Sequence, residues 1–173
     1  MKQYLEAGEI VSVHGVYGEM KVYPCTDTAK DFCKLKTLYF DEEGKHPVKV
    51  KSARTQKNMA LVSLEGIDDV DTARKYIGRY LFLNRDDIRL PKGTYFIADL
   101  IGANVVDIDS GEHYGTICDV TSPADRDIYH VRLQNGEERM IPAVKEFVPE
   151  ITVSADEATV YIRPIAGLLK DED

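Results

Sequence analysis

The stretch Pro91–Gly102, which reads PKGTYFIADLIG, divides the chain into two parts of different composition. It opens with a proline and a glycine, which interrupt regular helices and strands, and continues with the aromatic pair Tyr95 and Phe96. Residues 1–90 carry 15 Lys and Arg against 14 Asp and Glu, a net charge of +1, whereas residues 91–173 carry 7 against 16, a net charge of −9. A change of composition at such a break predicts a domain boundary.

The chain has 173 residues, a length that suits one medium domain or two small ones. We expect a first domain over residues 1–90, a junction over 91–102, and a second domain over 103–173 that ends in an acidic tail. With 43% hydrophobic and 30% charged residues, the chain can bury a core and is not disordered by composition.

Short β-rich segments, separated by Gly, Pro, Asn or Asp, recur in both parts of the chain. The Asn135-Gly136 pair between two such segments is typical of a β-hairpin. Two short helices are expected, one near 29–35 and one that begins after Asp69. The pattern therefore predicts a mostly β fold of two small antiparallel β-barrels. The expected strands are 4–13, 20–23, 37–40, 46–54, 59–64, 80–83, 103–108, 113–120, 127–133, 138–141, 151–153 and 159–162.

The acidic character of the chain, with a pI near 5.0, bears on its partners. A protein that binds RNA mainly through phosphates is expected to be basic, because its affinity comes from counterion release. The acid here is concentrated in residues 91–173, so this part is expected to repel nucleic acid and attract a basic protein.

The densest basic segment is the expected strand over 46–54. Alternation places Lys49 and Lys51 on one face of this strand, and Arg54 follows them. These side chains either form a solvated outer face or contact RNA phosphates. The RNA hypothesis also includes His14 and Gly15, in the glycine turn between the first two strands.

No catalytic or metal-binding set is apparent in the sequence. Cys25, Cys33 and Cys118 form no C-x-x-C pair, and the four histidines lack ligand spacing. We therefore expect no enzyme activity, no metal and no cofactor. No apolar run approaches the roughly 18 residues of a membrane span, and the N-terminus lacks the apolar stretch of a signal peptide, so we expect a cytoplasmic protein with no membrane partner.

Four stretches, taken together and in order, resemble the RimM family of ribosome maturation factors. The first, Gly8–Val22, contains a His-Gly-x-x-Gly-Glu turn between two strands, and the second contains Tyr95-Phe96 followed by Asp-Leu-Ile-Gly. The third, Met140–Val148, contains Ile-Pro-Ala, and the fourth is Gly167–Leu169. Each motif is weak alone, but the ordered set spans nearly the whole chain.

This resemblance implies an N-terminal barrel like those of translation factors and reductases, followed by a PRC-type barrel. It implies a non-enzymatic assembly factor that binds the immature small ribosomal subunit through small-subunit ribosomal protein nineteen, and that promotes 16S rRNA processing and maturation of the head domain. It places partner contacts on Tyr95, Phe96, Pro142 and Phe147. We expect a monomer.

Two alternatives stay open at this stage. The aromatic pair Tyr95 and Phe96 could cement the two domains instead of binding a partner. The chain could also be a flavin- or nucleotide-binding reductase-type barrel protein, because related barrels bind such cofactors. The second alternative needs a phosphate site, and the glycine turn at His14–Glu19 is followed by a strand rather than by the helix that phosphate motifs require.

Overall fold

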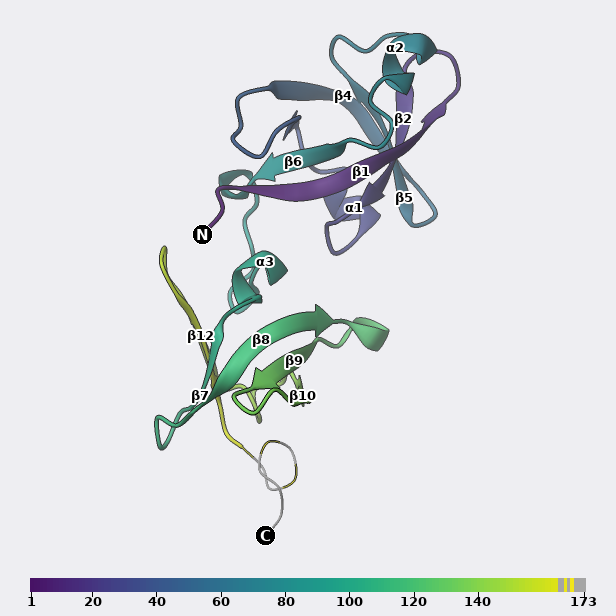
Figure 1. Ribbon diagram of the computed structural model, residues 1–173. Helices are drawn as coiled ribbons and strands as arrows, with labels where there is room; N and C mark the ends of the chain where they lie inside the picture. The colour runs from purple at the N-terminus through teal and green to yellow at the C-terminus, as the bar shows by residue number, and fades with distance from the viewer. Residues whose placement is uncertain (165–166, 168, 170–173) are drawn as a thin grey trace. The chain divides into compact units, whose positions relative to one another are not determined.

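The computed structural model describes residues 1–164, 167 and 169, and the chain forms two compact units. We call Lys2–Arg89 the N-terminal unit and Leu90–Asp173 the C-terminal unit (Figure 1). Residues 168 and 170–173, which include Leu168 of the fourth motif and the acidic end of the predicted tail, lie outside the described residues.

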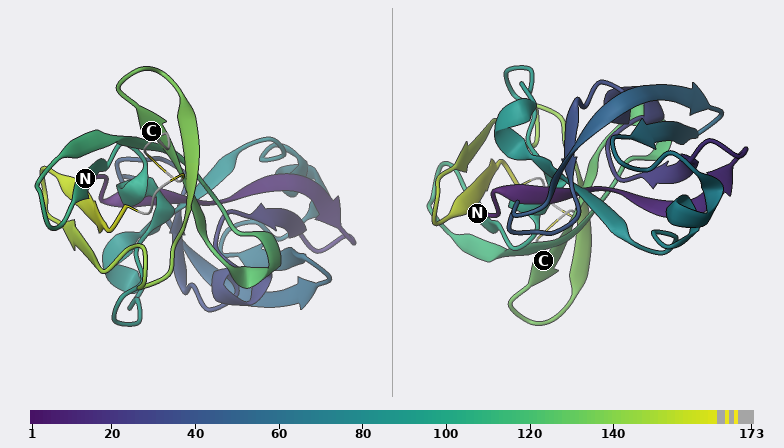
Figure 2. Two further views of the ribbon diagram at one scale, coloured as in Figure 1. Left: turned by 90° about the horizontal axis from the view of Figure 1, so that it is seen from below. Right: turned by 90° about the horizontal axis from the view of Figure 1, so that it is seen from above.

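Six antiparallel strands close the N-terminal unit into a barrel in the order β1-β2-β5-β4-β3-β6. Figure 2 shows the strands of this unit wrapping around a common interior. The interior follows from alternation, because the cross-strand pairs Met20–Val62 and Val22–Ala60 are fully buried. The strands are β1 Tyr4–His14, β2 Glu19–Pro24, β3 Thr37–Tyr39, β4 Pro47–Gln56, β5 Met59–Leu64 and β6 Tyr80–Asn84.

Two short helices, α1 (Ala29–Phe32) and α2 (Val70–Arg74), pack on the barrel strands, and the 3-10 turn η1 (Arg85–Asp87) follows β6. The Thr28 hydroxyl accepts a hydrogen bond from the N–H of Asp31, and the Asp69 carboxylate accepts one from the N–H of Thr72. The predicted cap at Asp69 is confirmed, and α1 ends at Phe32, sooner than the helix expected near 29–35.

The C-terminal unit is a six-stranded sheet in the order β10-β9-β8-β7-β12-β11. The helix α3 (Ile97–Leu100) precedes it, and the turn η2 (Pro123–Asp125) lies between β8 and β9. The predicted mostly β fold class is confirmed. The strands are β7 Asn104–Asp107, β8 His113–Thr121, β9 Ile128–Leu133, β10 Glu138–Pro142, β11 Glu150–Val153 and β12 Ala158–Ile162.

One pairing in the C-terminal unit differs from the antiparallel arrangement expected from the sequence. Strands β7 and β12 pair in parallel, the one such pair among the strands that the structure describes. The predicted hairpin at Asn135-Gly136 is confirmed, because β9 and β10 pair on either side of it. Gly115 on β8 allows a close approach, since a Cβ there would lie 2.0 Å from the carbonyl oxygen of Arg132.

A single apolar cluster forms the core of the C-terminal unit. Val105, Val131 and Ile141 are among its most buried side chains, and Leu100 of α3 belongs to it. Tyr95 packs against the same cluster. Part of the Pro91–Gly102 stretch is therefore built into the core of this unit.

Candidate functional site

The aromatic pair predicted to bind a partner is half-buried in the C-terminal unit. The Tyr95 hydroxyl donates a hydrogen bond to the carbonyl oxygen of Ile151 on β11, at 3.0 Å. The Phe96 carbonyl accepts from the N–H groups of Asp99 (3.0 Å) and Leu100 (3.3 Å), so Phe96 is the N-cap residue of α3. Tyr95 is thus fixed within its own unit by its hydroxyl and its packing.

A second tyrosine lies near Tyr95. Tyr129 on β9 is 6% exposed, and burial raises its pKa to about 12, with smaller contributions from Asp127 and Tyr95. The phenol of Tyr129 therefore stays neutral at physiological pH. The two tyrosines therefore add neutral aromatic surface near the start of α3.

Pro142 and Phe147, the other predicted partner contacts, lie at and just beyond the end of β10. Pro142 is half-buried opposite Ile128 on β9. Phe147 is also half-buried, packs against the same core as Tyr95, and its carbonyl accepts from the N–H of Arg163 at 2.9 Å. All four predicted partner residues thus belong to one unit, and each of them is partly accessible.

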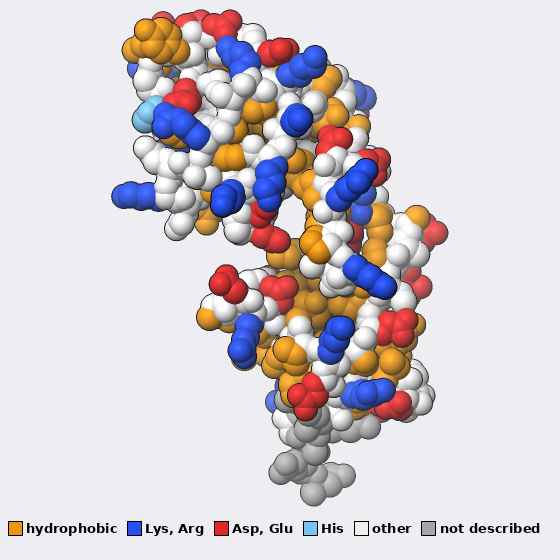
Figure 3. All heavy atoms as spheres, turned by 180° about the vertical axis from the view of Figure 1, so that it is seen from behind, with side chains coloured by type: hydrophobic (Ala, Val, Ile, Leu, Met, Phe, Trp, Pro, Cys, Tyr) orange, Lys and Arg blue, Asp and Glu red, His pale blue; other side chains and the backbone are white. Residues whose placement is uncertain are grey.

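The surface of the C-terminal unit is rich in carboxylates, which Figure 3 shows in red on one face. Of the thirteen Asp and Glu residues in 91–164, eleven are exposed, and the exceptions are Asp99 and Asp107. Glu146 and Glu150, beside Phe147, are exposed and make no ion pair among the residues that the structure describes. Within residues 91–164, the carboxylates counted in the sequence are therefore mostly presented to solvent.

The predicted RNA contacts lie in the N-terminal unit and differ in how free their charges are. Lys51 pairs with Asp68 at 2.6 Å. Arg54 pairs with Glu19, its Nη2 lying 2.9 Å and its Nε 3.4 Å from the two carboxylate oxygens. Lys49 is exposed and has no ion-pair partner within the described part of the chain, so its charge is the most available of the three.

These three cations lie on strand β4, where a register shift interrupts the alternation of inward and outward side chains. Lys51 lies at a register shift in the β4–β5 pairing, because Val50 pairs with Leu64 and Ser52 with Ser63. The shift explains why Lys51 and its neighbour Ser52 are both exposed, which simple alternation does not predict.

His14 and Gly15 lie where β1 turns into β2. The His14 Nε2 atom is 3.7 Å from Glu19, the carboxylate that also binds Arg54. Gly15 has a φ of +67°, which confirms the expected tight turn. The structure therefore brings His14 and Arg54 together around one carboxylate, whereas Lys51 is bound elsewhere.

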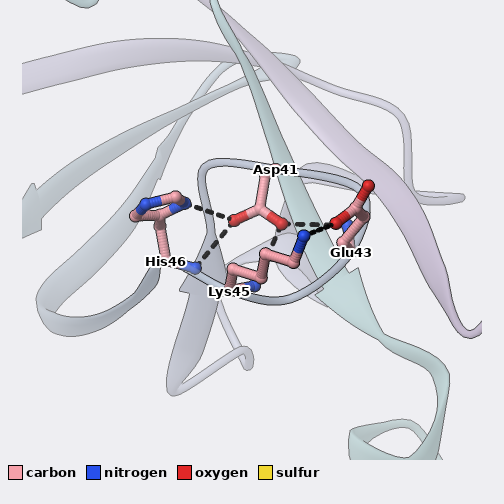
Figure 4. Close-up of polar contacts among 4 residues, drawn as sticks. All are labelled: Asp41, Glu43, Lys45 and His46. Carbon is pink, nitrogen blue, oxygen red and sulfur yellow. Dashed lines mark hydrogen bonds and ion pairs between the residues drawn. The ribbon is translucent and has the colours of Figure 1, made fainter.

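Sequence reasoning missed the polar network in the turn between β3 and β4, which Figure 4 shows. The Asp41 carboxylate accepts hydrogen bonds from the N–H groups of Glu43 (2.9 Å), Lys45 (2.9 Å) and His46 (2.7 Å), and from the His46 ring (2.9 Å). These bonds, led by that from Lys45, lower the pKa of Asp41 to about 2. The network holds the turn closed, and all of its hydrogen bonds are internal.

The described residues also bear on catalysis. No group of three His, Cys, Asp or Glu side chains in residues 1–164 gathers as metal ligands would. Burial raises the pKa of the Cys25 and Cys33 thiols, which disfavours a reactive thiolate at either position. None of the helices in the described part of the chain is long and apolar enough to span a membrane.

Comparison with known proteins places both units in known families. Residues 5–88 match the family model of the RimM N-terminal domain, and residues 92–169 match that of the PRC-barrel domain. The chain is 41% identical over 166 residues to the ribosome maturation factor RimM of Clostridium botulinum strain Langeland, covering 95% of this chain and 96% of that protein. It is 35% identical to the ribosome maturation factor RimM of Clostridioides difficile strain 630, over 96% of each chain.

A solved structure is also similar. The crystal structure of a RimM protein from Pseudomonas aeruginosa is 26% identical, covers 91% of this chain and 96% of its own, and superposes with a TM-score of 0.45.

Proposed function

The chain belongs to the RimM family of ribosome maturation factors, and from this premise we propose that it is a non-enzymatic assembly factor for the small ribosomal subunit. In this role it binds the immature particle and favours the conformation in which 16S rRNA is processed and the head domain matures. It is released once the mature surface no longer favours binding. The proposal includes a cytoplasmic location and a monomeric chain.

The observation that carries this proposal is the acidic, exposed surface of the C-terminal unit. The described part of this unit, residues 91–164, carries 6 Lys and Arg against 13 Asp and Glu, a net charge of −7 that attracts a basic partner and repels bare RNA. Small-subunit ribosomal protein nineteen, the partner implied by the family resemblance, is basic. The half-buried aromatics Phe96 and Phe147 supply apolar area beside the carboxylates, which suits the centre of a protein interface.

The different charges of the two units suggest different binding partners for each. We propose that residues 1–90 and 103–173 are separate domains joined through 91–102, and the two compact units support this. The C-terminal unit would hold the protein partner, while His14, Gly15, Lys49, Lys51 and Arg54 of the N-terminal unit lie near the RNA.

A charge-reversal experiment tests the partner surface. Glu146→Lys with Glu150→Lys replaces two exposed carboxylates near Phe147 that have no ion-pair partner among the described residues, and binding to purified small-subunit ribosomal protein nineteen should weaken at least tenfold at low salt. The matched control, Glu42→Lys with Glu65→Lys, makes the same change of net charge on the N-terminal unit and should leave affinity within about twofold. Equal losses in both variants would show that only net charge matters and would remove the assignment of the surface.

A further inference from the structure

The hairpin between β1 and β2 presents two apolar side chains to solvent at its tip. Val16 is 64% exposed and Tyr17 is 83% exposed, the highest value among the aromatic side chains that the structure describes. Figure 3 shows hydrophobic atoms projecting at one corner of the N-terminal unit, with both acidic and basic side chains around them. An aromatic ring so fully exposed contributes little to the stability of the barrel.

The base of this hairpin is held in place. Gly18, with a φ of +84°, is buried against the chain before α2, where a Cβ would lie only 2.4 Å from the carbonyl oxygen of Ile67. On the other side the Glu19 carboxylate joins His14 and Arg54. The tip is therefore displayed from a fixed support, which lowers the entropic cost of using it in binding.

The charges around the hairpin differ between its two sides, because Gly18 lies against the chain at Asp69, next to Asp68, whereas basic side chains lie toward β4. The strand register places Lys21, Leu61 and Arg54 side by side on β2, β5 and β4. Lys21 and Arg54 are thus neighbours on either side of Leu61, and His14 lies next to them across Glu19. His14 and Arg54 share the Glu19 carboxylate, and Lys21 on β2 adds a second permanent cation, so phosphate is attracted to this side of the hairpin and not to the side of Asp68 and Asp69.

We propose that Tyr17 stacks on an unpaired base of RNA, while Lys21 and Arg54 contact the adjoining phosphates. An exposed aromatic ring beside cations is the arrangement with which proteins bind single-stranded nucleic acid. Duplex RNA hides its base faces, so the occupant is a loop, bulge or single-stranded segment. The inference rests on the proposed function. It assigns the binding of single-stranded RNA to this hairpin, whereas the acidic surface of the C-terminal unit disfavours RNA.

A tryptophan reporter tests the stacking directly, because the chain contains no tryptophan. In the full-length protein, Tyr17→Trp introduces a single indole at the tip, and Tyr23→Trp introduces one at a matched exposed tyrosine (59%) on β2. Titration with a 12-nucleotide single-stranded RNA at low salt should quench the fluorescence of the first variant and leave the second nearly unchanged. Duplex RNA of equal length should quench neither.

Affinity measurements with the same oligonucleotide complete the test. Tyr17→Phe should bind like the unchanged protein, whereas Tyr17→Ala should bind about 5- to 150-fold more weakly, which corresponds to roughly 1–3 kcal/mol of stacking per base. Both variants should melt like the parent chain. Two outcomes would overturn the inference. One is that single-stranded RNA does not quench the indole of the Tyr17→Trp variant. The other is that small-subunit proteins free of RNA quench it. Continued pelleting of Tyr17→Ala with immature particles would keep the proposed function intact in either case.

Discussion

Substitutions at the adjacent aromatics Tyr95 and Phe96 are expected to have different effects: those at Tyr95 should lower the free energy of unfolding, and those at Phe96 should weaken particle binding. Tyr95→Phe removes only the hydroxyl that donates to the Ile151 carbonyl at 3.0 Å. A neutral hydrogen bond of this kind contributes about 1 kcal/mol net. Tyr95→Ala also removes a half-buried ring, and since full burial of such a side chain contributes roughly 1.5–3 kcal/mol, we expect a total loss of about 2–3 kcal/mol.

Urea denaturation of the C-terminal unit, followed by circular dichroism, measures these losses as changes in the free energy of unfolding. Binding to immature small subunits, measured by co-sedimentation, should stay within about twofold for Tyr95→Phe because the hydroxyl is already bonded within the unit. Phe96→Ala should weaken binding at least fivefold if the ring is a hot spot. The Phe96→Leu variant, which keeps apolar volume, is the matched control for folding.

Two results would refute this reasoning. If Tyr95→Phe unfolds with an unchanged free energy, the bond to Ile151 does not hold the segment. If Phe96→Ala binds particles as the parent chain does, the exposed part of this ring makes no partner contact, and its role is confined to the fold.

Three further predictions concern the N-terminal unit. Gly18→Ala should destabilise the unit by at least about 1–2 kcal/mol in urea denaturation, because alanine is strained at a φ of +84° and its Cβ would meet the Ile67 carbonyl. Asp41, whose pKa is lowered to about 2, should titrate well below 3.8 in carbon-13 NMR; its contribution to stability is complete above pH 4 and is lost as the pH falls towards 2. Lys49→Ala should reduce the slope of log affinity against log salt for immature particles by about 1, since Lys49 is exposed and has no ion pair in the described part of the chain.

Each of these has a control. Gly15→Ala is strained by φ alone, with no atom within 4 Å of the added Cβ, so it should cost less than Gly18→Ala. Asp41→Asn should lose the extra pH dependence between 4 and 2, and an Asp41 midpoint near 3.8 would contradict the network. Lys34→Ala removes a cation already paired with Asp31 at 2.8 Å, and an equal change of slope in both lysine variants would count against a specific phosphate contact.

Sequence patterns predicted those elements well whose structure depends on neighbouring residues. The Asn135-Gly136 turn and the Asp69 cap depend on a few neighbouring residues, so the sequence alone contains the information. The helix α3 at Ile97–Leu100 was missed, because four residues show no helical period. The parallel pairing of β7 with β12 depends on residues more than fifty positions apart, which no local pattern specifies.

The sequence predicted the sign of the charge on each surface but not which charges are paired. Charge counting indicated an acidic surface on the second half of the chain, and the structure shows those carboxylates exposed. It did not indicate that Lys51 and Arg54 are already paired with Asp68 and Glu19, since both partners lie on other elements. The exposure of Tyr17 was also missed, because the pattern of a glycine turn does not say which side chain it presents.

Co-sedimentation of the full chain with immature and mature small subunits, at low and moderate salt, tests the central claim most directly. The account predicts that the chain pellets with the immature particle in preference to the mature one, and that moderate salt weakens this binding because the contacts are electrostatic. Equal binding to both particles, or binding to neither, would contradict the assignment of this chain as a small-subunit assembly factor.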